Sequence, residues 1–289
     1  LERYNQLQNS LASADRVFQV LDEEQEPQSF APVQKPTTSG HIEFQNVTFR
    51  YSESGPDVLN NINVQIVPGT AVALVGRTGS GKSTMISLIQ RMYDLKIGEI
   101  RIDGQDITKL GLRDLRSRIG VVQQDNFIFS GTILNNITLD NPSISRERAL
   151  WAAERAQCLD LLNRHGGVDA MVQERGANLS VGERQLIAFA RALAFDPEIL
   201  ILDEATANID SVNEERIQKA LQNVTKGRTS LIIAHRLSTI VGCDQILLLE
   251  NGRLMQNGSH SQLVDVPGPY RELCQSYFGK KETIPNVSI

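Results

Sequence analysis

The segment from Gly76 to Ser83 has the residue types and spacing of a phosphate-binding loop. Glycine backbones can turn their N–H groups inward at conformations that a Cβ atom would block, so such a loop can wrap a chain of phosphates. Lys82 would reach the β- and γ-phosphates, and the Ser83 hydroxyl would bind Mg²⁺. The predicted nucleotide-binding residues here are Gly76, Thr78, Gly79, Ser80, Gly81, Lys82, Ser83 and Thr84.

Two adjacent carboxylates, Asp203 and Glu204, follow an apolar segment that begins at Glu198. A strand that ends in this way delivers both acids to the edge of the sheet where the phosphate loop lies. Asp203 would then hold Mg²⁺, and Glu204 would act as general base on the attacking water. Alone, an apolar strand followed by Asp-Glu also fits a solvated strand end. The upstream loop favours the catalytic interpretation, with Lys82 assisting.

Short apolar runs alternate with helical stretches, which indicates an α/β fold with a mainly parallel sheet. The expected strands are His41–Tyr51, Val58–Val67, Ala71–Val75, Ile119–Val122, Ile199–Leu202, Leu231–Ala234 and Ile246–Leu249. The expected helices include Lys82–Met92, Arg146–Leu162, Gly182–Phe195 and Ser211–Leu221. Residues 132–195 are mostly helical and form an insertion, and Asn251-Gly252 predicts a hairpin turn.

Residues 1–22 carry apolar side chains at alternating steps of three and four, which places them on one stripe of a helix. The stripe consists of Tyr4, Leu7, Leu11, Ala14, Phe18 and Leu21. It could pack on the core of this chain; we favour a helix that continues from an upstream helical domain. Residues 23–40 collect proline, glutamate and glycine and are predicted to be a linker.

Composition excludes several classes of function. The net charge is −5, from 29 basic and 34 acidic residues, so no basic excess points to nucleic acid. The apolar runs are far shorter than the ~20 residues that cross a bilayer, and no signal peptide is visible. The first residue is leucine, which suggests an excised fragment. Three widely spaced cysteines indicate neither a disulfide framework nor a zinc site.

The segment Leu179–Gln185 resembles the LSGGQ-type signature of ABC ATPases, and it lies just upstream of the Asp-Glu strand, as in that family. The resemblance implies that Ser180 and Gly182 donate to the γ-phosphate of ATP. Two residues depart from the pattern: Val181 replaces the first glycine, and Glu183 replaces the glutamine.

Further positions match ABC landmarks. The resemblance implies that Tyr51 stacks on adenine, with a half-buried strand tyrosine as the alternative. It implies that Gln124 contacts Mg²⁺ and water and communicates with the membrane part, with Gln123 as the competing choice. Asp210 corresponds to the aspartate of the D-loop, and His235 corresponds to the switch histidine that touches the γ-phosphate.

The resemblance covers about residues 41–280 and implies a P-loop NTPase (RecA-like) core, an antiparallel β subdomain and a helical subdomain at about 125–195, followed by a tail at 281–289. Residues 174–176 resemble the X-loop of exporters, although Gln173 replaces its usual preceding glycine. The leading helix, at residues 13–22, resembles the segment that joins an exporter's last membrane helix to its ATPase.

These features together imply the ATPase domain of a multidrug or lipid exporter. Its expected cofactors are ATP and Mg²⁺. Its expected partners are its own transmembrane domain and a second ABC ATPase domain, identical or related, at the cytoplasmic face of the membrane. The alternatives are a soluble ABC ATPase of DNA repair or translation, or the separate ATPase subunit of an importer.

Overall fold

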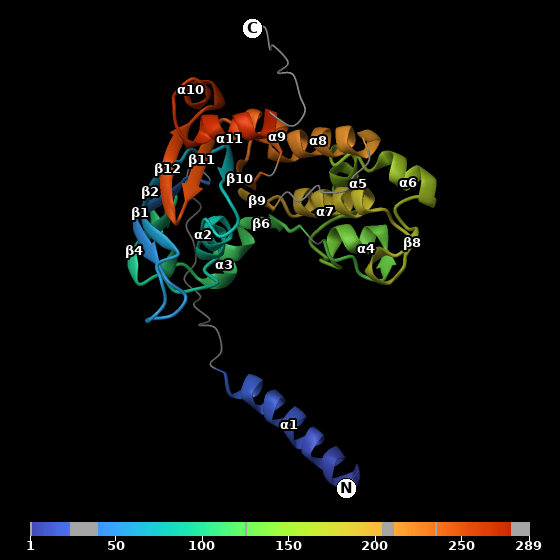
Figure 1. The fold of residues 1–289 in the computed structure, drawn as a ribbon. Coiled ribbons are helices and arrows are strands. Elements are labelled where there is room, and N and C mark those ends of the chain that lie inside the picture. The colour runs from blue at the N-terminus through green and yellow to red at the C-terminus, as the bar shows by residue number, and fades with distance from the viewer. Residues whose placement is uncertain (1, 24–39, 125, 204–210, 235, 279–289) are drawn as a thin grey trace.

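The computed structural model describes residues 2–23, 40–124, 126–203, 211–234 and 236–278. In these residues the chain forms a six-stranded sheet, a four-stranded sheet, a small strand pair and a lobe of helices (Figure 1). This arrangement confirms the predicted α/β class.

The six-stranded sheet is mainly parallel, as predicted. Its spatial order is β12 (Arg253–Gly258), β11 (Gln245–Glu250), β3 (Ala71–Val75), β10 (Thr229–Ile233), β9 (Ile199–Asp203) and β6 (Ile119–Val122). Only the pairing of β11 with β12 is antiparallel within this sheet. The predicted turn connects these two strands, because Asn251 and Gly252 both have positive φ values, of 47° and 74°.

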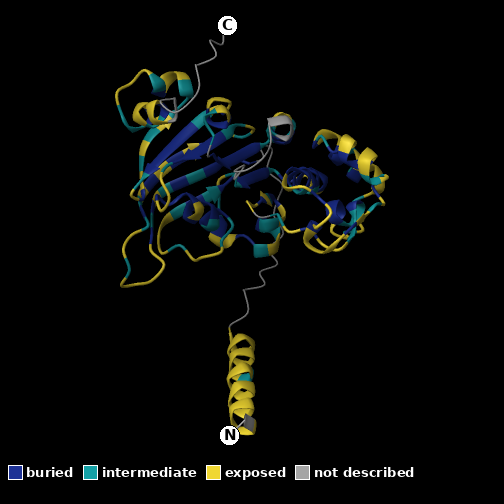
Figure 2. Ribbon diagram, turned by 45° about the vertical axis from the view of Figure 1, so that its right-hand side comes forward, coloured by how far each residue is buried: buried dark blue, intermediate teal, exposed yellow. Residues whose placement is uncertain are grey.

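Successive side chains of each central strand enter different cores. In β3, Val72 and Leu74 pack on one face of the sheet, whereas Ala73 and Val75 pack on the other. A strand that is buried on both faces must be apolar throughout, which explains the uninterrupted apolar run. Figure 2 shows the buried strands crossing the middle of the molecule. The central sheet therefore provides a fixed edge from which functional loops emerge.

The four-stranded sheet is antiparallel and covers one face of the central sheet. Its order is β2 (Leu59–Ile66), β1 (Ile42–Phe49), β4 (Ile97–Ile102) and β5 (Gln105–Asp106). Its inward side chains share a core with α2 (Lys82–Ile89) and α3 (Leu112–Ser117). The predicted antiparallel β subdomain is confirmed, although β4 and β5 were not predicted from the sequence; a short 3₁₀ turn, η1 (Ile107–Lys109), follows β5.

A buried arginine connects this region to the central sheet. Arg118 forms ion pairs with Asp103, beyond the end of β4, and with Glu198, just before β9. The Arg118 backbone carbonyl also accepts hydrogen bonds from the N–H groups of Glu198 and Ile199, each at 3.0 Å. These contacts fix the start of the strand that ends at Asp203.

The helical lobe lies beside the sheets at the right of Figure 1. It contains α4 (Ile133–Thr138), α5 (Arg146–Arg155), α6 (Leu159–His165) and α7 (Val181–Phe195), with β7 (Gly131–Thr132) paired to β8 (Met171–Val172) and a 3₁₀ turn, η2 (Glu174–Gly176), before α7. It includes much of the predicted insertion at 132–195.

The predicted single helix Arg146–Leu162 is wrong, because the chain forms two helices there. Gln157 adopts a left-handed φ of 61°, and the Cys158 N–H donates to the Ala153 carbonyl at 2.8 Å. This is the hydrogen-bond pattern of a Schellman helix end. The helix predicted over Lys82–Met92 also ends early, at Ile89.

The remaining helices lie toward the C-terminus, and one lies at the N-terminus. They are α8 (Ser211–Thr225), α9 (Leu237–Val241), α10 (His260–Val264), α11 (Pro269–Phe278) and α1 (Glu2–Asp22). The predicted apolar stripe of α1 is exposed instead of packing on the core of this chain, and Figure 2 shows the helix exposed along its length. No described helix is long and apolar enough to span a membrane.

Candidate functional site

The predicted phosphate loop connects β3 to α2, and its glycines are sterically required. Gly76 has a φ of 153°, and a Cβ atom there would lie 2.2 Å from the Leu249 carbonyl oxygen. Gly81 has a φ of 105°, and its Cβ would lie 2.6 Å from the Leu59 side chain. By contrast, a Cβ at Gly79 would meet no atom within 4 Å. The loop is thus tightly packed on the sheet at both ends and open at its middle.

Several backbone donors of this loop have no acceptor. In the part of the chain that the structure describes, the N–H groups of Gly79, Gly81, Lys82 and Ser83 donate to no protein atom. Unpaired N–H groups at the start of a helix favour an anion, because the positive end of the helix dipole adds to their partial charges. The loop therefore has the donors that a phosphate chain would need.

Lys82 is buried against the same loop. Its Nζ donates to the carbonyl oxygens of Gly76 at 2.7 Å and of Arg77 at 3.0 Å. Burial lowers the pKa of the Lys82 ammonium, and the nearby Asp203 carboxylate partly opposes this shift. The ammonium thus lies inside the cradle, held by groups that a phosphate could replace.

The central sheet brings the end of β9 toward this loop. Strand β10 lies between β3 and β9, and Ile233 pairs with Leu74 on one side and with Asp203 on the other. Since the carboxyl ends of parallel strands meet at one edge of the sheet, Asp203 lies on the same edge as the phosphate loop. Three predicted site residues, Glu204, Asp210 and His235, lie outside the described residues.

Tyr51 lies in an aromatic cluster at the end of the antiparallel sheet. Its ring makes edge contacts with Phe49 and Tyr93, each with the centroids 5.1 Å apart. Its hydroxyl hydrogen-bonds to Thr84 Oγ1 at 2.8 Å, which connects it to α2 directly behind Ser83. The side chain is 55% exposed and lines a hollow of about 510 Å³. This hollow has the size of a small-ligand site, although no residue of the phosphate loop lines it.

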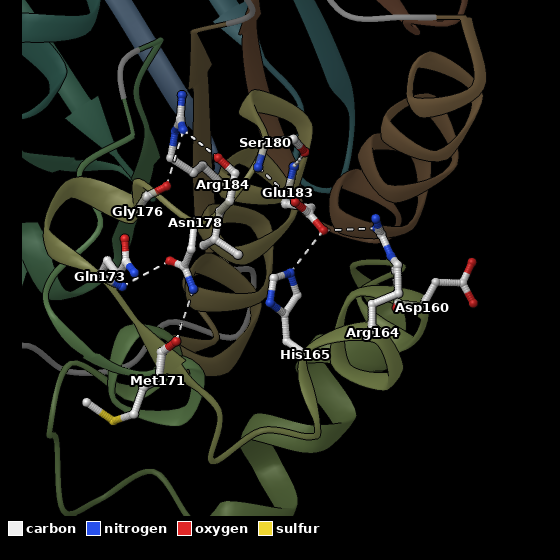
Figure 3. Close-up of polar contacts among 11 residues, drawn as sticks. Asp160, Arg164, His165, Met171, Gln173, Gly176, Asn178, Ser180, Glu183 and Arg184 are labelled. Carbon is white, nitrogen blue, oxygen red and sulfur yellow. Dashed lines mark hydrogen bonds and ion pairs between the residues drawn. The ribbon is translucent and has the colours of Figure 1, made fainter.

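The signature-like segment forms the N-terminus of α7 (Figure 3). Ser180 is the N-cap residue, and its hydroxyl oxygen accepts the Glu183 N–H at 3.2 Å. The Ser180 N–H in turn donates to the Glu183 carboxylate at 2.8 Å. This reciprocal pair is a capping box, which the sequence Ser-x-x-Glu already indicates.

Gln124 lies in a second hollow, of about 340 Å³, between the central sheet and the helical lobe. Arg175 of η2 and Val181 of the signature-like segment line the same hollow, whereas Gln123 does not. The hollow therefore groups Gln124 with Arg175 of the X-loop-like segment.

Two polar side chains that the sequence did not single out hold the backbone on either side of η2, and Arg184 also donates to the Gly176 carbonyl of η2 at 3.5 Å. Asn178 accepts the Gln173 N–H at 3.0 Å and donates to the Met171 carbonyl at 3.1 Å. The Arg184 guanidinium donates to the Leu179 carbonyl at 2.8 Å (Figure 3). Each contact joins a side chain to a backbone group five, seven or eight residues away, and no motif named from the sequence predicts it.

Comparison with known proteins places this geometry in a family. The family model described as ABC transporter matches residues 59–207, from β2 through the phosphate loop and α7 to the residues after β9. The chain belongs to the ABC transporter family. This confirms the ABC ATPase domain predicted from the signature-like segment.

The relatives of this ABC domain are exporters. The chain is 44% identical over 285 residues to a probable multidrug resistance ABC transporter ATP-binding/permease protein of Bacillus subtilis, covering 98% of this chain and 42% of that protein. It is 44% identical over 277 residues to the ATP-dependent lipid A-core flippase of Escherichia coli, covering 95% and 47%. The chain thus spans less than half of the length of these relatives.

A solved ABC structure agrees with the fold. The structure of a bacterial Atm1-family ABC exporter with ATP bound superposes with a TM-score of 0.82 at 36% identity, over 98% of this chain and 49% of that one. The predicted ABC ATP-binding domain of exporter type is therefore confirmed.

Proposed function

We propose that this chain is the ATP-hydrolysing motor domain of a membrane exporter, and that it works as a pair closed around two Mg-ATP molecules. One observation carries the pairing. Ser180 and Gly182 belong to the helical lobe, and in the described residues neither shares a hydrogen bond or ion pair with the phosphate loop of its own chain. A second chain supplies the phosphates that they would bind.

The proposed nucleotide site uses the loop from Gly76 to Thr84. Its unpaired N–H groups and the buried Lys82 ammonium would hold the phosphates, and Tyr51 would stack on adenine. Ser83, Asp203 and Gln124 supply oxygen atoms, which are the ligands that Mg²⁺ prefers. When bound, magnesium would neutralise charge that develops on the transferring phosphoryl group.

The remaining predicted residues would carry out hydrolysis. Glu204 would take a proton from the attacking water, and His235 would contact the γ-phosphate. Across the interface, Ser180 and Gly182 of the second chain would donate to that phosphate, with Asp210 near the contact. Hydrolysis would remove the group that joins the two chains and so reopen the pair.

The proposed membrane partner follows from two surfaces. The exposed apolar stripe of α1 needs an apolar surface to pack against, which a neighbouring transmembrane domain would provide. Gln124 and Arg175 line one hollow, which supports the proposal that they pass a signal between the nucleotide and the membrane part. The motor would then act at the cytoplasmic face of the membrane and power export, of multidrug or lipid type as the relatives' names suggest.

Light scattering on a Glu204→Gln chain tests the pairing. This variant should bind ATP without consuming it, so the 32.0 kDa chain should double its mass with Mg-ATP and stay single without nucleotide or with Mg-ADP. A chain that binds ATP yet remains single at all concentrations would contradict the composite site. Adding Ser180→Ala to this variant should weaken the dimer, whereas adding Ser10→Ala, at an exposed serine of α1, should not.

Changing Tyr51 tests the adenine contact. Stacking on an aromatic ring contributes about 1–3 kcal/mol, so Tyr51→Ala should weaken ATP binding roughly 5- to 150-fold. Tyr51→Phe keeps the ring and loses only the hydrogen bond to Thr84, so it should bind ATP within about threefold of the parent. Isothermal titration of both variants provides the measurement. Equal affinity of Tyr51→Ala and parent would exclude stacking on this ring.

A further inference from the structure

Glu183 stands where the ABC signature usually has a neutral glutamine, and the structure shows how its charge is held. Its carboxylate points back into the helical lobe (Figure 3). One oxygen, Oε2, accepts the Ser180 N–H and closes the capping box. The Glu183 carboxylate therefore holds the backbone of Ser180, whose hydroxyl is proposed to donate to the γ-phosphate of ATP.

The other oxygen of Glu183 meets two side chains of α6. Its Oε1 lies 2.9 Å from Arg164 Nη2 and 3.4 Å from His165 Nε2. The Glu183 side chain is only 7% exposed, whereas Arg164 is 58% exposed and reaches it from the surface. In the described part of the chain, Oε1 has no other partner. Arg164 and His165 thus offset the cost of burying this carboxylate oxygen.

The carboxylate is ionised in this environment. Burial raises the pKa of Glu183, but the hydrogen bonds from Ser180 and the nearby Arg164 and His165 outweigh it, so the pKa lies below its ordinary value. A full negative charge therefore resides in the first turn of α7. Such a charge stabilises the helix dipole, yet it would repel a γ-phosphate that approaches the same helix end.

The capping contacts leave the correct donors for a phosphate. Because the Ser180 oxygen accepts the Glu183 N–H, its own O–H proton remains available to donate outward. The N–H groups of Val181 and Gly182 have no acceptor among the described residues. Three donors are therefore presented together, and their placement depends on the Glu183 carboxylate.

The helix that carries Arg164 is itself anchored. Leu161 and Leu162 of α6 are buried in the hydrophobic core, and Asp160 forms an ion pair with Arg216 of α8. Arg164 therefore extends from a fixed helix toward Glu183 and not from a free loop.

We propose that Arg164, assisted by His165, is a positioning residue for the ATP sandwich: it holds and neutralises Glu183, so that Ser180 and Gly182 can donate hydrogen bonds to the γ-phosphate of the ATP bound to the partner chain. The inference rests on the proposed function, since it concerns the same interface. It predicts that Arg164 affects closure of the pair and leaves ATP binding to the single chain unchanged.

A double-mutant cycle in the Glu204→Gln chain tests this role, with Arg164→Gln, Glu183→Gln and both together. Light scattering measures the Mg-ATP concentration at half-dimerisation, and ATP titration of the dilute single chain measures binding. Arg164→Gln should raise the Mg-ATP concentration at half-dimerisation about three- to tenfold, a range that allows for the exposure of Arg164. It should leave the ATP affinity of the single chain unchanged. The double variant should lie within about twofold of Glu183→Gln, because the charge that needs compensation is gone.

Arg146→Gln is the matched control, because it removes an exposed arginine–aspartate pair, at 2.7 Å, from the same lobe. It should not change half-dimerisation, and all variants should share the parent's unfolding temperature within a few degrees. The role of Arg164 would be overturned if Arg164→Gln dimerised at the same Mg-ATP concentration as the parent. It would also be overturned if adding Arg164→Gln to Glu183→Gln raised that concentration as much as it does in the parent. If the Glu204→Gln parent itself never dimerises, the composite site fails and the role of Arg164 fails with it.

Discussion

A Lys82→Ala chain should bind Mg-ATP about 10- to 100-fold more weakly than the parent and should release almost no phosphate. The Lys82 ammonium lies inside the cradle, where its Nζ contacts the carbonyl oxygens of Gly76 and Arg77. Hydrogen bonds from a charged donor contribute about 1.5–3 kcal/mol, which corresponds to this loss of affinity. Isothermal titration gives the affinity, and a phosphate-release assay gives the rate.

Lys219→Ala is the control for this change. Lys219 is an exposed lysine of α8 that pairs with Glu215 at 2.8 Å, so its removal alters the net charge equally and leaves the loop intact. It should bind and hydrolyse ATP like the parent. Thermal unfolding of both variants separates lost binding from a lost fold. A folded Lys82→Ala chain with parental ATP affinity would refute the phosphate-cradle assignment.

A Glu204→Gln chain should hydrolyse ATP about 10²- to 10⁴-fold more slowly while its ATP affinity stays within about threefold of the parent, because a general base contributes a rate factor of that size. The amide keeps the shape of the carboxylate but cannot accept a proton from the attacking water. Phosphate release at saturating Mg-ATP measures the rate, and titration at the same magnesium concentration measures binding.

Glu215→Gln provides the matched carboxylate-to-amide change at an exposed position of α8 and should leave the rate unchanged. Phosphate release by Glu204→Gln at the parental rate would remove Glu204 from the mechanism. A loss of affinity as large as the loss of rate would assign Glu204 to nucleotide binding in place of proton transfer.

The positions of the parallel strands of the central sheet were predictable because these strands are apolar on both faces, whereas shorter or more polar strands such as β4 and β5 were missed. The run Ala71–Val75 is apolar on both faces, and the structure buries it between two cores. Helix ends were less predictable. The helices predicted to reach Met92 and Leu162 both end early at a left-handed residue that is not glycine, Arg91 with a φ of 52° and Gln157 with a φ of 61°. Without glycine, the sequence contains no local signal for such an end.

In the candidate site, too, the local patterns were predictable and the contacts between separate helices were not. The loop from Gly76 to Ser83 and the capping box of Ser180 are local patterns, so spacing alone predicted the phosphate cradle and could predict the paired backbone contacts. The partners of Glu183 were missed, because Arg164 and His165 approach from another helix. The placement of α6 relative to α7 in the folded lobe determines these side-chain contacts, and the spacing of residues along the sequence does not predict them.

The pairing of β3 with β10 has a consequence for folding during synthesis on the ribosome. The Gly69 N–H donates to Thr229 Oγ1 at a sequence separation of 160 residues, at the point where these strands meet. At the ribosome's pace, about 5–20 residues per second, this separation takes on the order of ten to thirty seconds to synthesise. During that time β3 lacks the strand that pairs with one of its edges. The pairing of β3 with β10 can therefore form only late in synthesis, well after the strands of the antiparallel sheet have all emerged.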